Sequence, residues 1–213
     1  RDIDKLGYDR NFTIYDTDDS KRVLKDIIKE LDLEEKTFPP RELLGVISNA
    51  KGEMQSPEDF CQLWEQRGDW RKIRIGKVYK LYNKRLREAN ALDFDDIILH
   101  TVTLLQSDKD TREYYQNKFR YVLIDEYQDT NHMQYLLAGL LTGSHGNICV
   151  VGDDDQSIYG WRGAKIENIL HFEKQFPSAQ VFKLQRNYRS TKNILAVANE
   201  TIKNNGRRKQ KTL

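Results

Sequence analysis

After residue 120 the sequence alternates short apolar runs with helical patterns, and this alternation restricts the fold more than any other feature. The apolar runs lie at 121–124, 148–151 and 180–184, and helical patterns follow at 135–141, 166–176 and 190–202. Continuous apolar strands that alternate with helices are typical of a parallel sheet covered on both faces. We therefore expect an α/β region in which any ligand binds at the carboxyl ends of the strands.

Before residue 120 helical patterns dominate. Capping residues and prolines predict helix starts at 17–20, 39–40, 56–57 and 93–96, and the longest helix is expected at 70–89. The apolar side chains of this longest helix share one face. Basic side chains line much of the rest: Arg74, Lys77, Lys84 and Arg87. Such a face either contacts phosphates or is simply solvated.

The positive and negative charges of the chain nearly cancel, so no strong overall field attracts a polyanionic partner. The sequence has 213 residues, with 35 Lys+Arg against 33 Asp+Glu, so nucleic-acid binding would depend on local patches.

Two cysteines, Cys61 and Cys149, are too few for a disulfide framework or a four-cysteine zinc site, and their apolar neighbours predict buried, reduced thiols. No apolar run approaches the about 20 residues that span a bilayer, and the N-terminus does not resemble a signal peptide. We expect a soluble, cytoplasmic protein.

The first of three polar clusters follows the first predicted strand. It runs from 125 to 129 and begins with Asp125 and Glu126. An acidic residue at the end of an apolar strand is the Walker B arrangement, in which the aspartate holds Mg²⁺ and the next carboxylate orients or deprotonates a water. Alternatively, the acids cap the following helix, whose N-terminus favours negative charge.

The other two clusters follow the second and third predicted strands. In the cluster at 152–163, Tyr159 and Trp161 lie close to Arg162, which is typical of a stacking platform for single-stranded bases. Half-buried structural aromatics are the alternative. In the cluster at 186–191, Arg189 can reach a terminal phosphate and Tyr188 can stack on a base, unless the segment is an ordinary helix cap.

Together the three clusters closely resemble helicase motifs II, III and IV of the UvrD/Rep/PcrA family in superfamily 1. The matching segments are 125–130, 152–164 and 187–191, and segments 11–14 and 92–96 are also similar to that family. The resemblance implies a partial RecA-like parallel sheet with flanking helices, plus a mostly helical accessory subdomain. The expected divisions are a helical accessory (1B-like) subdomain at 1–115, the C-terminal part of the first motor domain at 116–205, and a basic tail at 206–213.

The resemblance implies ATP and Mg²⁺ as cofactors and assigns residues to them. Asp125 would ligate Mg²⁺ and Glu126 would activate the hydrolytic water. Gln156 would sense the γ-phosphate and couple it to DNA. Tyr188 would stack on the adenine, and Arg189 would contact the γ-phosphate.

The resemblance also implies single-stranded DNA and duplex/single-strand junctions as partners. Tyr159 and Trp161 would contact the tracking strand, with Arg162 supporting them. In the helical part, Lys51 is a candidate for contact with the DNA backbone. The family's activity is ATP-dependent 3′–5′ unwinding of DNA, in repair or replication.

One element of that family's ATP site is missing from these residues. No Gly-x-x-x-x-Gly-Lys-Ser/Thr sequence occurs, so there is no phosphate-cradling loop. We therefore expect a piece of a longer enzyme that is inactive as an ATPase on its own and that self-associates through an unpaired sheet edge. The alternatives are a non-catalytic DNA- or protein-binding module, and a metal nuclease that uses Asp125 with residues 153–155.

Overall fold

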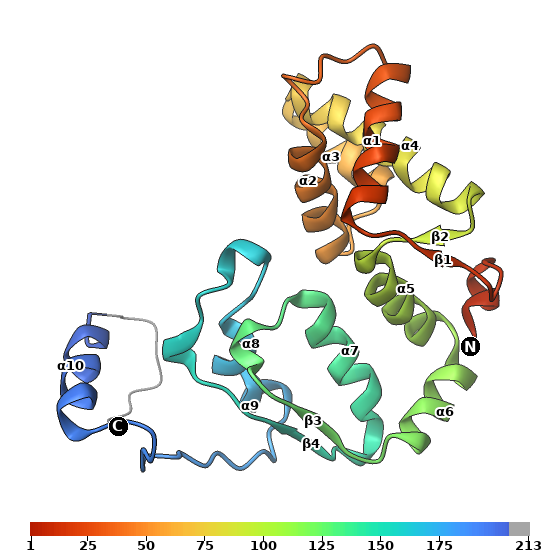
Figure 1. The fold of residues 1–213 in the computed structure, drawn as a ribbon. Helices are drawn as coiled ribbons and strands as arrows, with labels where there is room; N and C mark the ends of the chain where they lie inside the picture. Colours follow the sequence, from red (N-terminus) through yellow and green to blue (C-terminus); the bar gives the residue numbers. More distant parts are fainter. Residues whose placement is uncertain (205–213) are drawn as a thin grey trace. The chain divides into compact units, whose positions relative to one another are not determined.

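The computed structural model describes residues 1–204, apart from the side chains of Ser144 and Arg162, and these residues form two compact units (Figure 1). The first unit comprises Arg1–Arg120 and His132–Gly143, and the second comprises Tyr121–Asn131 and the residues from Ser144 onward. The division of the chain into an accessory subdomain at 1–115 and part of a motor domain at 116–205 stays a prediction, and the basic tail at 206–213 lies outside the described residues.

The first unit is built mainly from helices, several of which begin at a side-chain cap. They are α1 (Thr17–Glu30), α2 (Pro40–Gly52), α3 (Pro57–Arg67), α4 (Trp70–Glu88), α5 (Phe94–Ser107), α6 (Lys109–Lys118), α7 (His132–Thr142) and the short η1 (Ile3–Leu6). Asp16, Ser56 and Asp93 each close a capping box, in which the side chain accepts a backbone N–H one turn ahead. The predicted starts of α2, α3, α4 and α5 are confirmed, whereas α1 is capped by Asp16 instead of a residue in 17–20.

A single apolar core joins α1 to α4. The predicted buried face of α4 is confirmed, because Ile75, Val78, Tyr79, Tyr82 and Leu86 are each at most 1% exposed. The rest of this core comes from the other helices and the segments that flank them: Leu24, Ile27, Ile28, Phe38, Leu43, Ile47, Ala50, Phe60 and Ala91. Burial of apolar area on this scale is the main source of the unit's stability.

A short parallel ladder ties the two ends of the helical segment together. β1 (Thr13–Ile14) pairs with β2 (Ala91–Leu92), with Thr13 opposite Ala91 and Ile14 opposite Leu92. The chain therefore enters α1 and leaves α4 at neighbouring positions. This ladder was not predicted, because two-residue strands are too short to show an alternating pattern.

His100 on α5 makes the stability of the first unit depend on pH. Burial, with repulsion from Lys51 and Arg87 and partial compensation by Asp93, lowers the pKa of His100 from 6.5 to about 4, and its Nε2 lies 3.1 Å from the hydroxyl of Tyr8. Between these pH values the unfolded chain binds a proton that the folded chain does not. Stability is therefore lost as pH falls from 6.5 towards 4, by no more than about 3 kcal/mol.

We expect His100→Gln to flatten this pH dependence. The measurement is urea unfolding of the wild-type and variant chains at pH 7 and pH 4.5. The exposed His145 provides the matched control, since His145→Gln should keep the wild-type pH dependence. An unchanged slope in His100→Gln would contradict the assignment.

The second unit contains a two-stranded parallel sheet. β3 (Val122–Ile124) pairs with β4 (Ile148–Val150), with Leu123 opposite Cys149. One face of this sheet is open, because Leu123 is 76% exposed and Cys149 is also exposed. The expectations that the sheet is covered on both faces and that Cys149 is buried are therefore wrong for this chain, whereas the α/β class is confirmed.

The remaining helical elements of the described chain are short. They are η2 (Tyr127–Asp129), η3 (Gly143–His145), η4 (Asp154–Gln156), η5 (Gly160–Arg162), α8 (Glu167–Leu170), α9 (Phe172–Gln175) and α10 (Lys192–Ile202). The helix predicted at 166–176 is thus divided into α8 and α9. The strand predicted at 180–184 is not formed, and Phe182 and Leu184 are 79% and 83% exposed. An apolar run forms a strand only where a neighbouring strand presents its backbone, and no such pairing involves this segment in the described residues.

No helix among the described residues is long and apolar enough to cross a membrane.

Candidate nucleotide and nucleic-acid site

Asp125 and Glu126 lie at the carboxyl end of β3, as predicted. Both are exposed, and Asp125 Oδ1 accepts the backbone N–H of Glu126 at 2.9 Å. Glu126 has a φ of 49°, in the left-handed region that a residue with a side chain rarely adopts. Its side chain makes no capping bond to the following turn η2. The acids are exposed to solvent at the end of the strand.

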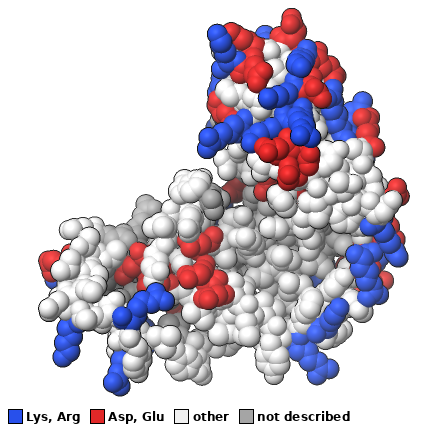
Figure 2. Space-filling view, in the orientation of Figure 1, with Lys and Arg blue, Asp and Glu red and all other residues white. Residues whose placement is uncertain are grey.

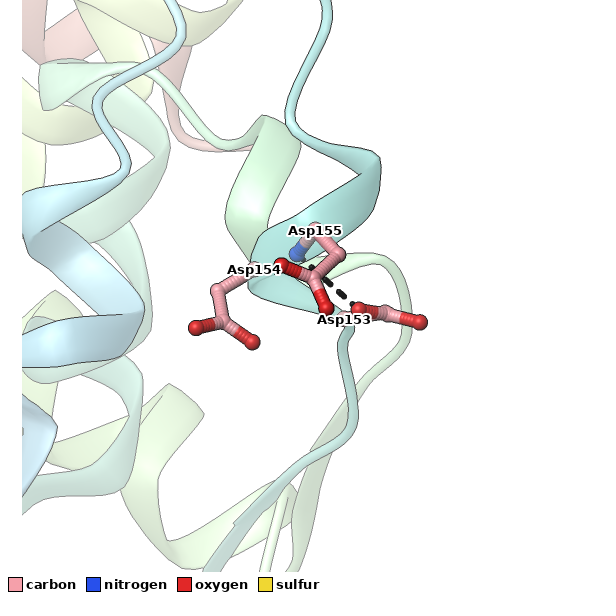
Figure 3. A group of neighbouring side chains, drawn as sticks. All are labelled: Asp153, Asp154 and Asp155. Carbon is pink, nitrogen blue, oxygen red and sulfur yellow. Dashed lines mark hydrogen bonds between the residues drawn. The ribbon is translucent and has the colours of Figure 1, made fainter. Parts of the chain in front are cut away.

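The second cluster forms the tight turn η4 directly after β4. Figure 3 shows Asp153, Asp154 and Asp155 around this turn, with the backbone N–H of Asp155 donating to Asp153 Oδ1 at 3.0 Å. The other oxygen of Asp153 accepts from Gln156 Nε2 at 2.9 Å. Each of the three aspartates offers one oxygen within 4.8 Å of the others. The turn therefore fixes Gln156 through Asp153.

Gln128 connects these two clusters. Its side chain donates to Glu126 Oε2 at 2.8 Å and accepts the backbone N–H of Asp153 at 3.0 Å. Gln128 is 1% exposed, so this connection is shielded from water. The sequence analysis did not single out Gln128, although it lies within the first cluster, because amides in turns are common.

The oxygen donors at the end of β3 suit Mg²⁺. This ion prefers hard oxygen ligands and usually takes one or two carboxylates, with waters and phosphates completing its shell. Asp125 is exposed at the strand end, and no hydrogen-bond partner among the described residues contacts the buried Oδ1 of Asp129 nearby. The donor set thus fits the ion that the resemblance implies.

Tyr159 and Trp161 lie together on the surface of the second unit. Trp161 is 72% exposed and Tyr159 is 38% exposed, with ring centroids 6.3 Å apart and planes tilted by 52°. This exposure disfavours the alternative of half-buried structural aromatics for Trp161. The side chain of Arg162 lies outside the described part of the chain.

Tyr188 and Arg189 lie in the segment before α10. Tyr188 is 83% exposed, and the guanidinium of Arg186 lies 5.0 Å from its ring centroid. Asn187 Oδ1 accepts the backbone N–H groups of Arg189 and Ser190, both at 2.9 Å. In the described residues no hydrogen bond or ion pair joins Tyr188 or Arg189 to the first two clusters, so their roles stay predictions.

The structure contradicts the expectation that Lys51 contacts a DNA backbone. Its side chain is 0% exposed, and its ammonium lies 2.7 Å from Asp93 Oδ2 and 2.6 Å from Asp96 Oδ1. The hydroxyl of Tyr82 also donates to Asp93 Oδ2 at 3.0 Å. Lys51 follows Leu43 and Ile47 on the apolar face of α2, and that spacing was the signal for burial.

Some basic side chains of α4 are paired with other groups of the first unit. Lys84 pairs with Glu88 at 3.7 Å, and Arg87 donates to the backbone oxygen of Leu6 at 2.7 Å. On the face drawn in Figure 2, blue and red side chains are interspersed over the helices α1–α4. These contacts favour a solvated, charge-balanced face over a dedicated phosphate-binding stripe.

The comparison with known proteins agrees with this arrangement of motifs. A family profile described as "UvrD/REP helicase N-terminal domain" matches residues 1–177. The chain belongs to this family of helicases, and the resemblance inferred from the motifs is confirmed.

Particular relatives point to one kind of helicase within it. The chain is 51% identical over 213 residues to "ATP-dependent DNA helicase PcrA" of Staphylococcus epidermidis, and 50% identical to the protein of the same name from Staphylococcus aureus. These alignments cover 100% of this chain and 29% of each relative. The chain thus spans less than a third of the length of the curated relatives that it matches.

Proposed function

We propose that this chain is the part of a PcrA-like, ATP-dependent 3′–5′ DNA helicase that carries motifs II, III and IV. The observation that carries the proposal is the hydrogen-bonded connection from Glu126 through Gln128 to Asp153, which links the acidic end of β3 to the turn that holds Gln156. A non-catalytic binding module has no need of Glu126, Gln156 and Arg189 together. The names of the relatives supply the activity.

In this proposal the nucleotide is handled at the strand ends. Asp125 holds Mg²⁺, which supplies charge stabilisation at the phosphates. Glu126 orients the attacking water and accepts its proton, and Gln156 senses the γ-phosphate. Tyr188 stacks on the adenine and Arg189 contacts the γ-phosphate, where a positive charge stabilises the transition state.

DNA is bound by the aromatic side chains of the second unit. Tyr159 and Trp161 stack on bases of the tracking strand, with Arg162 in support, and unwinding occurs at duplex/single-strand junctions. The helical residues 1–115 act as the accessory subdomain and residues 116–205 belong to the first motor domain, in a cytoplasmic protein of DNA repair or replication.

The test compares the full-length protein with this 213-residue chain in two assays, DNA-stimulated ATP hydrolysis and displacement of a labelled strand. We expect both activities in the full-length protein. The chain alone should show neither, because it has no Walker A sequence to cradle the phosphates. A full-length protein that binds DNA without hydrolysing ATP would favour the binding-module alternative, and metal-dependent strand cleavage would favour the nuclease.

Replacing Trp161 by alanine should weaken binding of single-stranded DNA by the full-length protein. The expected loss is about 1–3 kcal/mol, the usual worth of one stacked base. Fluorescence anisotropy with a labelled oligonucleotide measures it. Trp70 is 61% exposed on the first unit, so Trp70→Ala is the control. Equal affinities for wild type and Trp161→Ala would exclude the proposed stacking.

A further inference from the structure

Gln128 is a buried amide whose orientation is fixed by its surroundings. Its Nε2 faces two carboxylate oxygens, Glu126 Oε2 at 2.8 Å and Asp129 Oδ2 at 3.3 Å. Its Oε1 faces the backbone N–H of Asp153 at 3.0 Å. A rotated amide would place oxygen against carboxylates and N–H against N–H, so only one orientation satisfies both sides.

The neighbouring backbone leaves this amide little room to move. A Cβ at Gly152, two residues after the end of β4, would lie 2.5 Å from Gln128 Oε1 and 2.8 Å from Ile169 Cδ1, so glycine at this position lets the backbone pass close to the amide. The backbone N–H of Tyr127 also donates to Val151 O at 2.9 Å. The turn after β3 and the turn after β4 are therefore held as one piece.

The exposed carboxylate of Glu126 depends on this amide. Among the described residues, Gln128 Nε2 is the one side-chain donor that contacts it. A glutamate side chain has three rotatable bonds and loses substantial entropy when it is held in one position. Without Gln128 the carboxylate would sample several rotamers above the strained backbone of residue 126.

The same bonds continue to Gln156. Gln128 accepts from the backbone of Asp153, and the side chain of Asp153 accepts from Gln156 Nε2 at 2.9 Å. A displacement of this turn breaks or lengthens the bond to Gln128 Oε1. Because the amide is rigid, that displacement is transmitted to its Nε2 and so to Glu126.

We propose that Gln128 is a positioning residue, which aligns the carboxylate of Glu126 and makes its alignment depend on the turn Asp153–Gln156. The proposal rests on the proposed function, in which Glu126 activates water. In this proposal one buried amide transmits a change in the DNA-coupled turn around Gln156 to the carboxylate that activates water. Coupling of this kind has to be measured as non-additivity between sites.

The experiment uses the full-length protein and two substitutions. Gln128→Met removes the side-chain hydrogen bonds to Glu126, Asp129 and Asp153 at similar volume. Gln128→Glu keeps an acceptor for the N–H of Asp153 but places a second carboxylate against Glu126. We expect both variants to lower kcat for ATP by about 10- to 100-fold, with a Kd for ATP within threefold of wild type. Both should also lose most of the stimulation by single-stranded DNA.

Gln106 provides the matched control, because it is an exposed glutamine on α5 of the first unit. Gln106→Met should keep wild-type turnover and stimulation. A variant that only unfolds is recognised because it no longer binds ATP. If Gln128→Met unfolds, the test is made with Gln128→Glu, which keeps the acceptor for the N–H of Asp153.

A double-mutant cycle with Glu126→Gln separates positioning from a purely structural role. If Gln128 acts through Glu126, Gln128→Met should lower the residual rate of Glu126→Gln by less than twofold. Equal losses in both backgrounds would overturn the inference, as would wild-type kcat and DNA stimulation in both Gln128 variants. If Glu126→Gln itself left turnover unchanged, the proposed function would fail first.

Discussion

Glu126→Gln in the full-length protein is expected to lower kcat for ATP hydrolysis by about 10²- to 10⁴-fold, the usual contribution of a general base. The amide has nearly the shape of the carboxylate, and it can still accept the hydrogen bond from Gln128. It cannot take a proton from water. Because Glu126 is exposed at the end of β3, the substitution should leave the fold unchanged. Steady-state ATPase kinetics measure the effect.

The control for this prediction is an exposed glutamate of the first unit. Glu113 on α6 pairs only with Lys109, at 3.5 Å across one helical turn, among the described residues. Glu113→Gln should retain wild-type turnover. The Kd for ATP, measured with a fluorescent analogue, should remain within a few-fold in both variants. Turnover of Glu126→Gln within fivefold of wild type would remove Glu126 from the mechanism.

Lys51→Met is expected to destabilise the chain by about 3–5 kcal/mol, the usual cost of breaking a buried ion pair by removing one partner. The ammonium lies within 2.7 Å of both Asp93 and Asp96, and methionine has neither its positive charge nor its three hydrogen-bond donors. Burial raises the pKa of Asp96 to about 6. Burial acts in the same direction on Asp93, but attraction to Lys51 and the hydrogen bonds from Lys51, the Asp96 backbone and Tyr82 together lower its pKa. The variant would therefore hold two carboxylates in the interior without a counter-charge.

Urea unfolding measures this loss, with Lys25→Met as the control, since Lys25 is an exposed lysine on α1. The control should change stability by less than about 0.5 kcal/mol. The loss in Lys51→Met should shrink at pH 5, where protonation neutralises the orphaned carboxylates. A loss below 1 kcal/mol at pH 7 would mean that the two carboxylates relax into water and that the buried ion pairs contribute little to stability.

Much of the first unit could be predicted from the sequence, because its local signals agree with its packing. Pro40, Ser56 with Pro57, and Asp93 begin helices where their chemistry favours helix starts, and the apolar side chains of α4 share the face that the core buries. The burial of Lys51 was missed. Lysine side chains usually lie in solvent, so burial was not expected. The side chain is buried because it lies on the apolar face of α2 and pairs with two acids at the start of α5.

The second unit was predicted less well, because its structure depends on partners rather than on local pattern. Residues 180–184 have the composition of a strand, but a strand requires a neighbouring backbone. For the candidate site, Asp125, Glu126 and Gln156 could be proposed from the sequence because each follows an apolar strand pattern. Gln128 could not, since only the register of β3 against β4 brings the two turns close enough for one amide to bridge them.

The pairing of β1 with β2 makes the helices α1–α4 an insertion in the geometric sense. Thr13 and Ala91 are neighbours, so everything between them leaves from and returns to one place. Elements attached in this way can be lengthened, shortened or exchanged without displacing the strands that carry them. A replacement must still be long enough to form a crossover of a dozen or more residues, because parallel strands cannot be joined by a tight turn. The helices α1–α4 therefore have the connectivity of an exchangeable attachment, which lets their surface diversify independently of the motif-bearing strands.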